Sequence, residues 1–149
     1  MVINQLNPGS DPMLKSNSKK LIKKLAQKYG LKLVMLYGSA AKDKLRPNSD
    51  IDMAILGERY FFEKQISDFN YDMMDVEEIE RRNFDIVPIS GENPILLYNI
   101  FNDGVPVYIK DEEEYCRIRC WARFTYEDNK RFFYGRDELI RKRLKNLNV

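Results

Sequence analysis

Apolar and polar positions along the chain alternate between short β-prone runs and longer amphipathic segments. The three clearest runs are LKLVMLYGS, IDMAIL and FDIVPI, which begin at Leu31, Ile51 and Phe84. Short apolar runs of this kind, rich in Ile, Val and Leu, predict strands. The segment FFEKQISDFNYDMMDVEEIERR lies between the second and third runs and has the length and charge of a helix. The order strand, connection, strand, helix, strand is typical of an α/β domain.

Further helices are expected on both sides of these runs. Ser18 or Asn17 can cap a helix through KKLIKKLAQKYG, because both residue types are favoured at helix N-termini. NPILLYNIFNDG predicts a helix with Pro94 in its first turn, and VPVYIKD predicts a short extended piece after it. The segment 111–147 contains no proline, so we expect one bent helix or two there, with Gly135 as the weak point.

Length and composition indicate a single globular domain without a membrane segment. The chain has 149 residues, of which 44% are hydrophobic and 32% charged, and no apolar run is long enough to span a bilayer. The first residues lack the apolar core of a signal peptide, so we expect a cytoplasmic protein. The predicted organisation is a flexible leader at 1–17, a main domain at 18–110, and a helical extension at 111–149 packed on that domain or on a partner.

The side chains that are absent limit the possible chemistry. The sequence has no histidine, which excludes imidazole bases and histidine-containing zinc sites, so any metal should be a hard cation bound by oxygen atoms. Cys116 and Cys120 are the two cysteines. Their spacing in a helical segment suits a disulfide poorly, so we expect free thiols.

Two aspartates one residue apart begin the second apolar run. In a strand, Asp50 and Asp52 point to the same face with their Cα atoms about 6–7 Å apart. Such a pair repels itself and should be partly protonated, exposed or neutralised by a cation, for which Mg²⁺ or Mn²⁺ is the natural choice. Asp85 occupies the same position near the start of the third run. A neighbouring strand could therefore bring a third carboxylate beside the first two.

A Gly-Ser turn after the first run supplies the other half of a candidate site. Gly38 lets the backbone approach an anion closely, and a helix beginning in AAKDKL would direct free N–H groups toward a phosphate. Lys42, Lys44 and Arg46 add positive charge nearby. A phosphate cradle beside metal-binding carboxylates is typical of phosphoryl or nucleotidyl transfer.

These motifs resemble the signature of the polymerase-β-like nucleotidyltransferases. Gly38-Ser39, ten further residues and Asp50-Ile51-Asp52 match their GS-x10-DxD pattern, and Asp85 in FDIV matches their third carboxylate. The length, together with LYNIFNDGVPVYIKDEEEY and RFTYEDNKRFFYGRDELIRKRL, is similar to the minimal nucleotidyltransferase (MNT) antitoxins, the partners of HEPN-domain ribonuclease toxins. The resemblance covers roughly Leu21 to Leu144. It implies a small mixed sheet flanked by helices, with a long C-terminal helical segment.

The resemblance also implies the role of each residue in the site. Asp50, Asp52 and Asp85 would bind Mg²⁺ and carry catalysis, with Asp85 readying the attacking hydroxyl. ATP would bind at a set of four residues, Gly38, Ser39, Lys42 and Ser49. Members of the family often carry Arg at the position of Lys42 and Gly at that of Asp43, so an acid here lies where the triphosphate would approach.

The implied function is AMP transfer from ATP to a hydroxyl, expected to be a tyrosine, of a HEPN toxin with which the chain forms a hetero-oligomer. Two alternatives remain open. The chain could neutralise the toxin by binding alone, with weak or no catalysis, or it could modify a small molecule such as an aminoglycoside. No second domain is evident that would form an acceptor pocket for a small molecule.

The tail is more basic than the rest of the chain. From Tyr115 onward it has ten Lys and Arg against four Asp and Glu, which indicates either a partner surface or a solvated helix face. Its aromatic residues could stack on nucleic-acid bases, but such helices more often pack on their own domain or on a protein. We therefore expect a protein partner and no nucleic acid.

Overall fold

A four-stranded mixed sheet forms the centre of the molecule in a computed structural model that describes residues 14–41, 49–58 and 63–147. The strand order is β3-β2-β1-β4. β1 pairs antiparallel with both β2 and β4, while β2 and β3 run parallel. The strands are β1 (Leu33–Tyr37), β2 (Ile51–Leu56), β3 (Phe84–Pro88) and β4 (Val105–Ile109). The three predicted runs and the extended piece are thus all strands, and the predicted fold class is confirmed.

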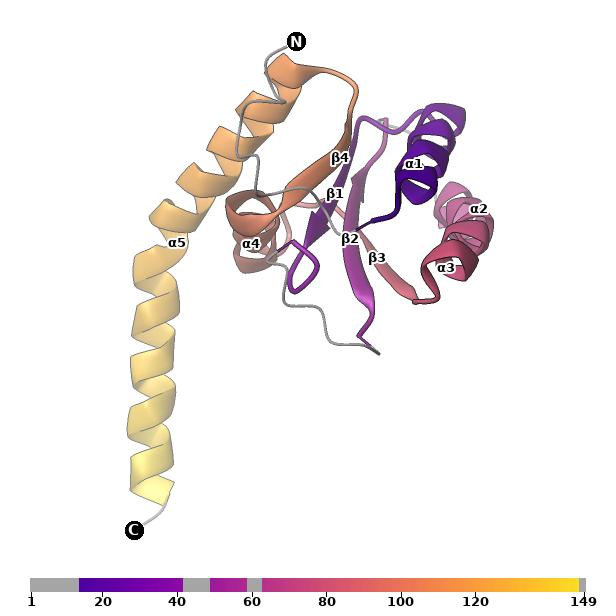
Figure 1. Ribbon diagram of the computed structural model, residues 1–149. Coiled ribbons are helices and arrows are strands. Elements are labelled where there is room, and N and C mark those ends of the chain that lie inside the picture. Colours follow the sequence, from indigo (N-terminus) through magenta and orange to yellow (C-terminus); the bar gives the residue numbers. More distant parts are fainter. Residues whose placement is uncertain (1–13, 42–48, 59–62, 148–149) are drawn as a thin grey trace.

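Five helices in the described part of the chain surround this sheet (Figure 1). They are α1 (Ser16–Lys28), α2 (Glu63–Asp72), α3 (Met74–Glu80), α4 (Pro94–Asp103) and α5 (Glu112–Leu147). α1, α2 and α3 lie on one side of the sheet, and α4 with the first part of α5 lies on the other (Figure 1). None of the helices in the described ranges is both long and apolar enough to span a membrane.

Each face of the sheet has its own hydrophobic core because side chains alternate along every strand. On the α1–α3 face, Ile51, Met53 and Ile55 of β2 are buried with Phe69 of α2 and other apolar residues. On the opposite face, the buried residues are Leu33, Met35, Ala54, Leu97, Ile100, Phe101 and Ala122. Residues of β2 with even numbers therefore face α4 and α5.

The N-terminus of α1 differs from the expectation. The helix begins at Ser16, one turn early, and its N-cap is Lys15, which makes no side-chain capping bond. Lys15 donates instead from its backbone N to Glu80 Oε1 at 2.8 Å and from Nζ to the Ile79 carbonyl at 2.9 Å. The predicted cap at Ser18 or Asn17 is wrong, because contacts with the end of α3 fix this terminus. Ser18 is buried inside the helix.

The helical segment between β2 and β3 consists of two helices in its described part. α2 ends at Asp72 and α3 begins at Met74, with Met73 fully buried between them. α4 matches its prediction, with Pro94 at its start and the Asn93 side chain accepting a hydrogen bond from the Leu96 N–H at 3.1 Å.

The tail is one continuous helix of 36 residues, which decides between the two predicted alternatives. Its first half packs on α4: Ala122 is buried, and the rings of Tyr98 and Tyr126 stack with centroids 4.0 Å apart. Gly135 does not break the helix. Beyond Gly135 every described side chain is exposed, and this part of α5 extends away from the sheet (Figure 1). The two cysteines are free thiols on its exposed surface, as predicted.

Candidate active site

A row of three polar side chains crosses the sheet where β1 ends and β2 and β3 begin. Asp52 is paired with Tyr37 of β1 on one side and with Asp85 of β3 on the other. All three lie on the face that packs against α4 and α5. Tyr37 packs against the hydrophobic core on that face, and so do Ala54 and Val87, which are two residues after Asp52 and Asp85 and therefore point to the same side. The predicted meeting of Asp52 and Asp85 is therefore confirmed by strand register.

Gly38 brings the backbone directly against the Asp52 carboxylate. It has a positive φ of 66°, the left-handed region in which only glycine is free of strain. A Cβ atom at this position would lie 2.5 Å from Asp52 Oδ2, closer than any real contact. A side chain at this position would be strained by the backbone and would have to displace the Asp52 carboxylate. The exposed Ser39 follows in the same turn, so a phosphate and a cation could be bound together beside Asp52.

The electrostatics of this row show a local excess of negative charge. Burial, followed by the charges of Asp85 and Asp50, raises the pKa of the half-buried Asp52 carboxyl above its ordinary value. Burial, followed by the charges of Asp52 and Asp85, raises the pKa of the Tyr37 hydroxyl. Because no described cation pairs with Asp52, ionising it costs free energy that a bound cation would offset.

Asp50 lies just outside the strand, contrary to the expectation that it continues the strand pattern with Asp52. β2 begins at Ile51, and Asp50 is exposed. The segment before β2 is held by the turn before β3. Arg82 Nη1 donates to the Ser49 carbonyl at 3.2 Å, and the Ile51 N–H donates to the Asn83 carbonyl at 2.9 Å.

The carboxylates fit a hard divalent cation by the chemistry of their oxygen donors, although they are not assembled around one. Among residues 14–41, 49–58 and 63–147, no three His, Cys, Asp or Glu side chains are gathered closely enough to hold a metal ion. Asp52 and Asp85 are direct neighbours across the parallel pair, and Asp50 is near enough for its charge to act on Asp52. Metal binding by all three residues remains a prediction.

Of the remaining predicted nucleotide ligands, the structure describes Ser39 and Ser49. Ser39 is exposed in the turn after Gly38, and Ser49 is half-buried beside Asp50. Lys42, Asp43, Lys44, Arg46 and most of AAKDKL, where a helix N-terminus was expected, lie outside the described residues.

Sequence reasoning did not select Tyr37, although it is part of the row. Tyr37 is the last strand residue before the Gly-Ser turn, and this position was the available clue. It places Tyr37 opposite Asp52 only when the antiparallel register of β1 and β2 is known.

Comparisons with known proteins agree with this fold. A family model described as polymerase beta, nucleotidyltransferase matches residues 19–113. A search of curated protein sequences gave no match. Among solved structures, a chain from a toxin–antitoxin crystal structure with AMP-PNP is 18% identical, with a TM-score of 0.62; the match covers 85% of this chain and 98% of that one.

Two further solved structures show the same fold. One contains the tri-AMPylated HEPN toxin of Shewanella oneidensis in complex with an MNT antitoxin, with 17% identity, a TM-score of 0.58, and coverage of 86% of this chain and 97% of that one. The other is the MntA–HepT toxin–antitoxin, with 17% identity, a TM-score of 0.59, and coverage of 87% and 99%. Since the family model spans more than half of the sequence, the chain belongs to the polymerase-β nucleotidyltransferase family.

Proposed function

We propose that this nucleotidyltransferase is an antitoxin that transfers AMP from ATP to a hydroxyl group, expected to be a tyrosine, of a HEPN ribonuclease toxin. The observation that carries the proposal is the contact of the Gly38 backbone with Asp52, which is itself in register with Asp85. This arrangement supports the proposal because the turn expected to bind phosphate, a carboxylate expected to bind the metal and a candidate base would lie side by side. The toxin–antitoxin complexes among the structures with this fold support the choice of partner.

Each residue of the site would have its own role in the transfer reaction. The turn at Gly38 and Ser39 would bind the triphosphate, and Asp50, Asp52 and Asp85 would hold Mg²⁺, which supplies charge stabilisation for the pyrophosphate that leaves. The acceptor oxygen attacks the α-phosphorus, and the bond from that phosphorus to the β-phosphate oxygen breaks. Asp85, exposed at the start of β3, is the candidate that takes up the hydroxyl proton.

The test of this proposal is direct transfer to the partner. Incubating the chain with ATP, Mg²⁺ and the purified toxin should add about 329 Da per AMP, the mass of AMP less water, to a toxin hydroxyl. Intact-mass spectrometry detects the addition, and fragmentation locates it. An unchanged toxin mass, together with full neutralisation, would contradict the enzyme and favour neutralisation by binding alone.

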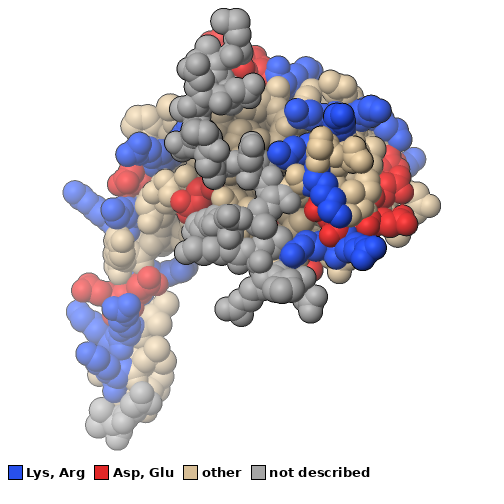
Figure 2. All heavy atoms as spheres, in the orientation of Figure 1, with Lys and Arg blue, Asp and Glu red and all other residues tan. Residues whose placement is uncertain are grey.

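The second half of α5 is the surface we expect to dock the toxin. Its exposed apolar side chains include Phe132, Leu144 and Leu147, which are 69%, 54% and 79% accessible. From Lys130 to Leu147 the helix carries seven Lys and Arg against two Asp and Glu. Figure 2 shows blue side chains along this part of the helix beside a tan edge. An apolar stripe with a strong positive charge fits an acidic protein surface better than a second copy of itself.

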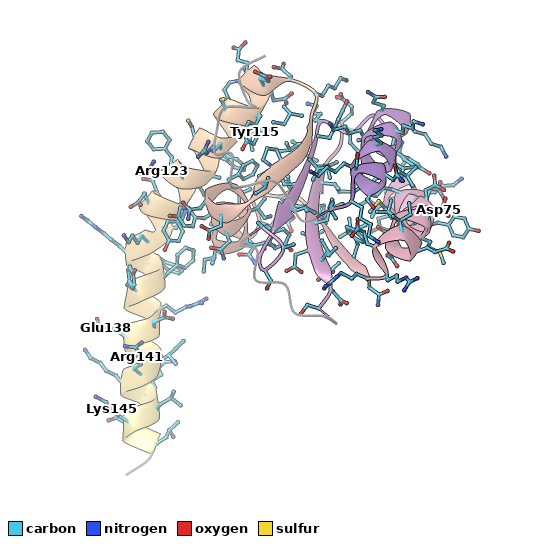
Figure 3. All side chains as sticks on the ribbon, viewed as in Figure 1. Asp75, Tyr115, Arg123, Glu138, Arg141 and Lys145 are labelled. Atoms are coloured by element: carbon cyan, nitrogen blue, oxygen red, sulfur yellow. The ribbon has the colours of Figure 1, made fainter. Side chains whose placement is uncertain are left out.

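Charge reversal tests this docking separately from the chemistry. Arg141 projects from the far part of α5, well away from the sheet (Figure 3), and Arg143 is exposed on the same segment. The double change of Arg141 and Arg143 to Glu should weaken toxin binding by about 10-fold or more and slow association. Calorimetry or surface plasmon resonance would measure this loss.

A matched control carries the same change in net charge on another element. Lys23 and Lys24 are exposed on α1, and replacing both with Glu should leave toxin binding almost unchanged. Equal losses in the two double variants would mean that only overall charge matters and that α5 is not the docking surface.

A further inference from the structure

One side chain in the row beside the Gly38 turn has no role in the transfer reaction described above. Tyr37 is the last residue of β1, directly before Gly38, and it pairs with Asp52 of β2. Since Asp52 pairs on its other side with Asp85, the order across the sheet is Asp85, Asp52, Tyr37. Tyr37 therefore lies on the side of Asp52 that is opposite to Asp85.

The ring and the hydroxyl of Tyr37 have different surroundings. Tyr37 is half-buried and packs against the hydrophobic core between the sheet and the helices α4 and α5. Burial, followed by the charges of Asp52 and Asp85, raises the pKa of its hydroxyl, so the hydroxyl itself lies near both carboxylates. The side chain thus has an apolar ring against the core and a polar atom at the edge of the candidate active site.

The fold does not explain why this side chain has a hydroxyl. The hydroxyl makes no hydrogen bond with any of residues 14–41, 49–58 and 63–147, although a buried tyrosine hydroxyl usually has a partner. Phenylalanine would pack against the same core without placing a polar atom next to two acids. A ligand that binds at the site could supply the missing partner.

The roles proposed for the neighbouring residues indicate which part of ATP would lie next to this hydroxyl. Asp85 is the candidate that takes up the acceptor's proton, so the acceptor oxygen would lie on the Asp85 side of the row. The attacking and leaving oxygens lie roughly in line across the phosphorus. The pyrophosphate would therefore lie on the other side, where Tyr37 and the Gly38 turn adjoin Asp52.

The chemistry of a phenol suits this position. A tyrosine hydroxyl is protonated at neutral pH because its ordinary pKa is about 10, so it can donate a hydrogen bond. Phosphate oxygens are charged acceptors, and hydrogen bonds to charged acceptors are shorter and stronger than those between neutral groups. A donor is useful here because the two carboxylates repel the phosphates.

We propose that the Tyr37 hydroxyl donates a hydrogen bond to the β- or γ-phosphate of ATP and keeps this bond while pyrophosphate leaves. The inference rests on the nucleotidyl transfer proposed above, and it adds to the triphosphate site a residue that lies outside the Gly-Ser and Asp-x-Asp motifs. Because AMP lacks the β- and γ-phosphates, the proposal predicts a difference between two nucleotides.

Binding of these two nucleotides tests the contact without requiring turnover. The probes, each with Mg²⁺, are AMP and an ATP analogue with a methylene group between its α- and β-phosphates, from which AMP cannot be transferred. Calorimetry measures the affinity of the wild type and of Tyr37→Phe for each probe. The variant should bind the ATP analogue about 10-fold more weakly, the loss expected of one hydrogen bond to a charged group. It should bind AMP as the wild type does.

Two controls separate the hydroxyl from the fold. The melting temperature of Tyr37→Phe without ligand should not fall below that of the wild type, because the ring still packs against the core and the hydroxyl has no partner among the described residues. Tyr108→Phe is the matched variant, since Tyr108 is a half-buried tyrosine of β4 that packs against the core on the opposite face of the sheet. It should bind both probes as the wild type does.

Three results would overturn the role of Tyr37: unchanged affinity of Tyr37→Phe for the ATP analogue, an equal loss of affinity for AMP, or no binding of the analogue by the wild type. The titration needs neither catalysis nor the toxin, so its outcome is independent of the transfer experiment. AMP transfer to the toxin together with an unaffected Tyr37→Phe variant would reject this contact alone. The expected titration without any transfer would reject the enzyme and retain the contact.

Discussion

Asp52→Asn should reduce AMP transfer by about 100-fold or more while leaving the fold intact. The Asp52 carboxylate is the central member of the row, with Asp85 beside it and the Gly38 backbone against it. Asparagine has nearly the same shape as aspartate but lacks the negative charge that a cation needs. Since burial and neighbouring acids raise the pKa of this carboxyl, its ionised form is disfavoured in the fold, and the neutral variant should melt no lower than the wild type in the absence of metal.

Thermal melting and a control variant make this prediction specific. Mg²⁺ with ATP should raise the melting temperature of the wild type, as a ligand of the native state must, and should do little for Asp52→Asn. Asp75 is exposed on α3, on the far side of the molecule from α5 (Figure 3), so Asp75→Asn should retain both activity and the shift. Equal shifts in wild type and Asp52→Asn would rule out Asp52 as a metal ligand.

Gly38→Val should reduce both stability and activity. The positive φ of Gly38 disfavours any side chain, a β-branched one most of all. The added Cβ would also meet the Asp52 carboxylate. Backbone strain and overpacking together should lower the free energy of unfolding by about 2–4 kcal/mol. Chemical denaturation measures that loss, and the remaining folded protein should transfer AMP about 100-fold more slowly because the turn and Asp52 are displaced.

Gly135→Ala is the matched control for a substitution at glycine. A Cβ at Gly135 would meet nothing within 4 Å, and alanine in a helix interior should raise stability by about 0.5–1 kcal/mol. Normal transfer and normal unfolding of Gly38→Val would show that the turn after β1 is not the phosphate cradle.

The sequence predicted those parts of the fold and site that depend on local pattern. The strands from Leu33, Ile51 and Phe84 were found because each is a short apolar run. The pairing of Asp52 with Asp85 followed from their equal positions in two neighbouring strands, and the structure confirms it through parallel register. The Gly-Ser pair suggested a turn in which the backbone needs glycine, and Gly38 has the positive φ that favours this residue.

Features that depend on tertiary contacts could not be predicted in this way. The start of α1 is set by Lys15 and Glu80, which are far apart in sequence, so the local capping rule that selected Ser18 or Asn17 was wrong. Arg82 holds the segment before β2 through the Ser49 carbonyl, which is 33 residues away in sequence. Tyr37 joins the site only through antiparallel pairing. Each of these features depends on a contact with a residue that is distant in sequence, so a local sequence pattern cannot predict it.

The most direct test of the proposed function is whether neutralisation of the toxin outlasts the antitoxin. The toxin is incubated with ATP, Mg²⁺ and a substoichiometric amount of the wild type or of Asp52→Asn, the antitoxin is then removed, and ribonuclease activity is measured together with the intact mass of the toxin. If AMP transfer neutralises the toxin, the wild type should leave an inactive toxin that is heavier by whole AMP units, and Asp52→Asn should leave an active toxin of unchanged mass. Lasting neutralisation by Asp52→Asn with no change in mass would contradict neutralisation by AMP transfer.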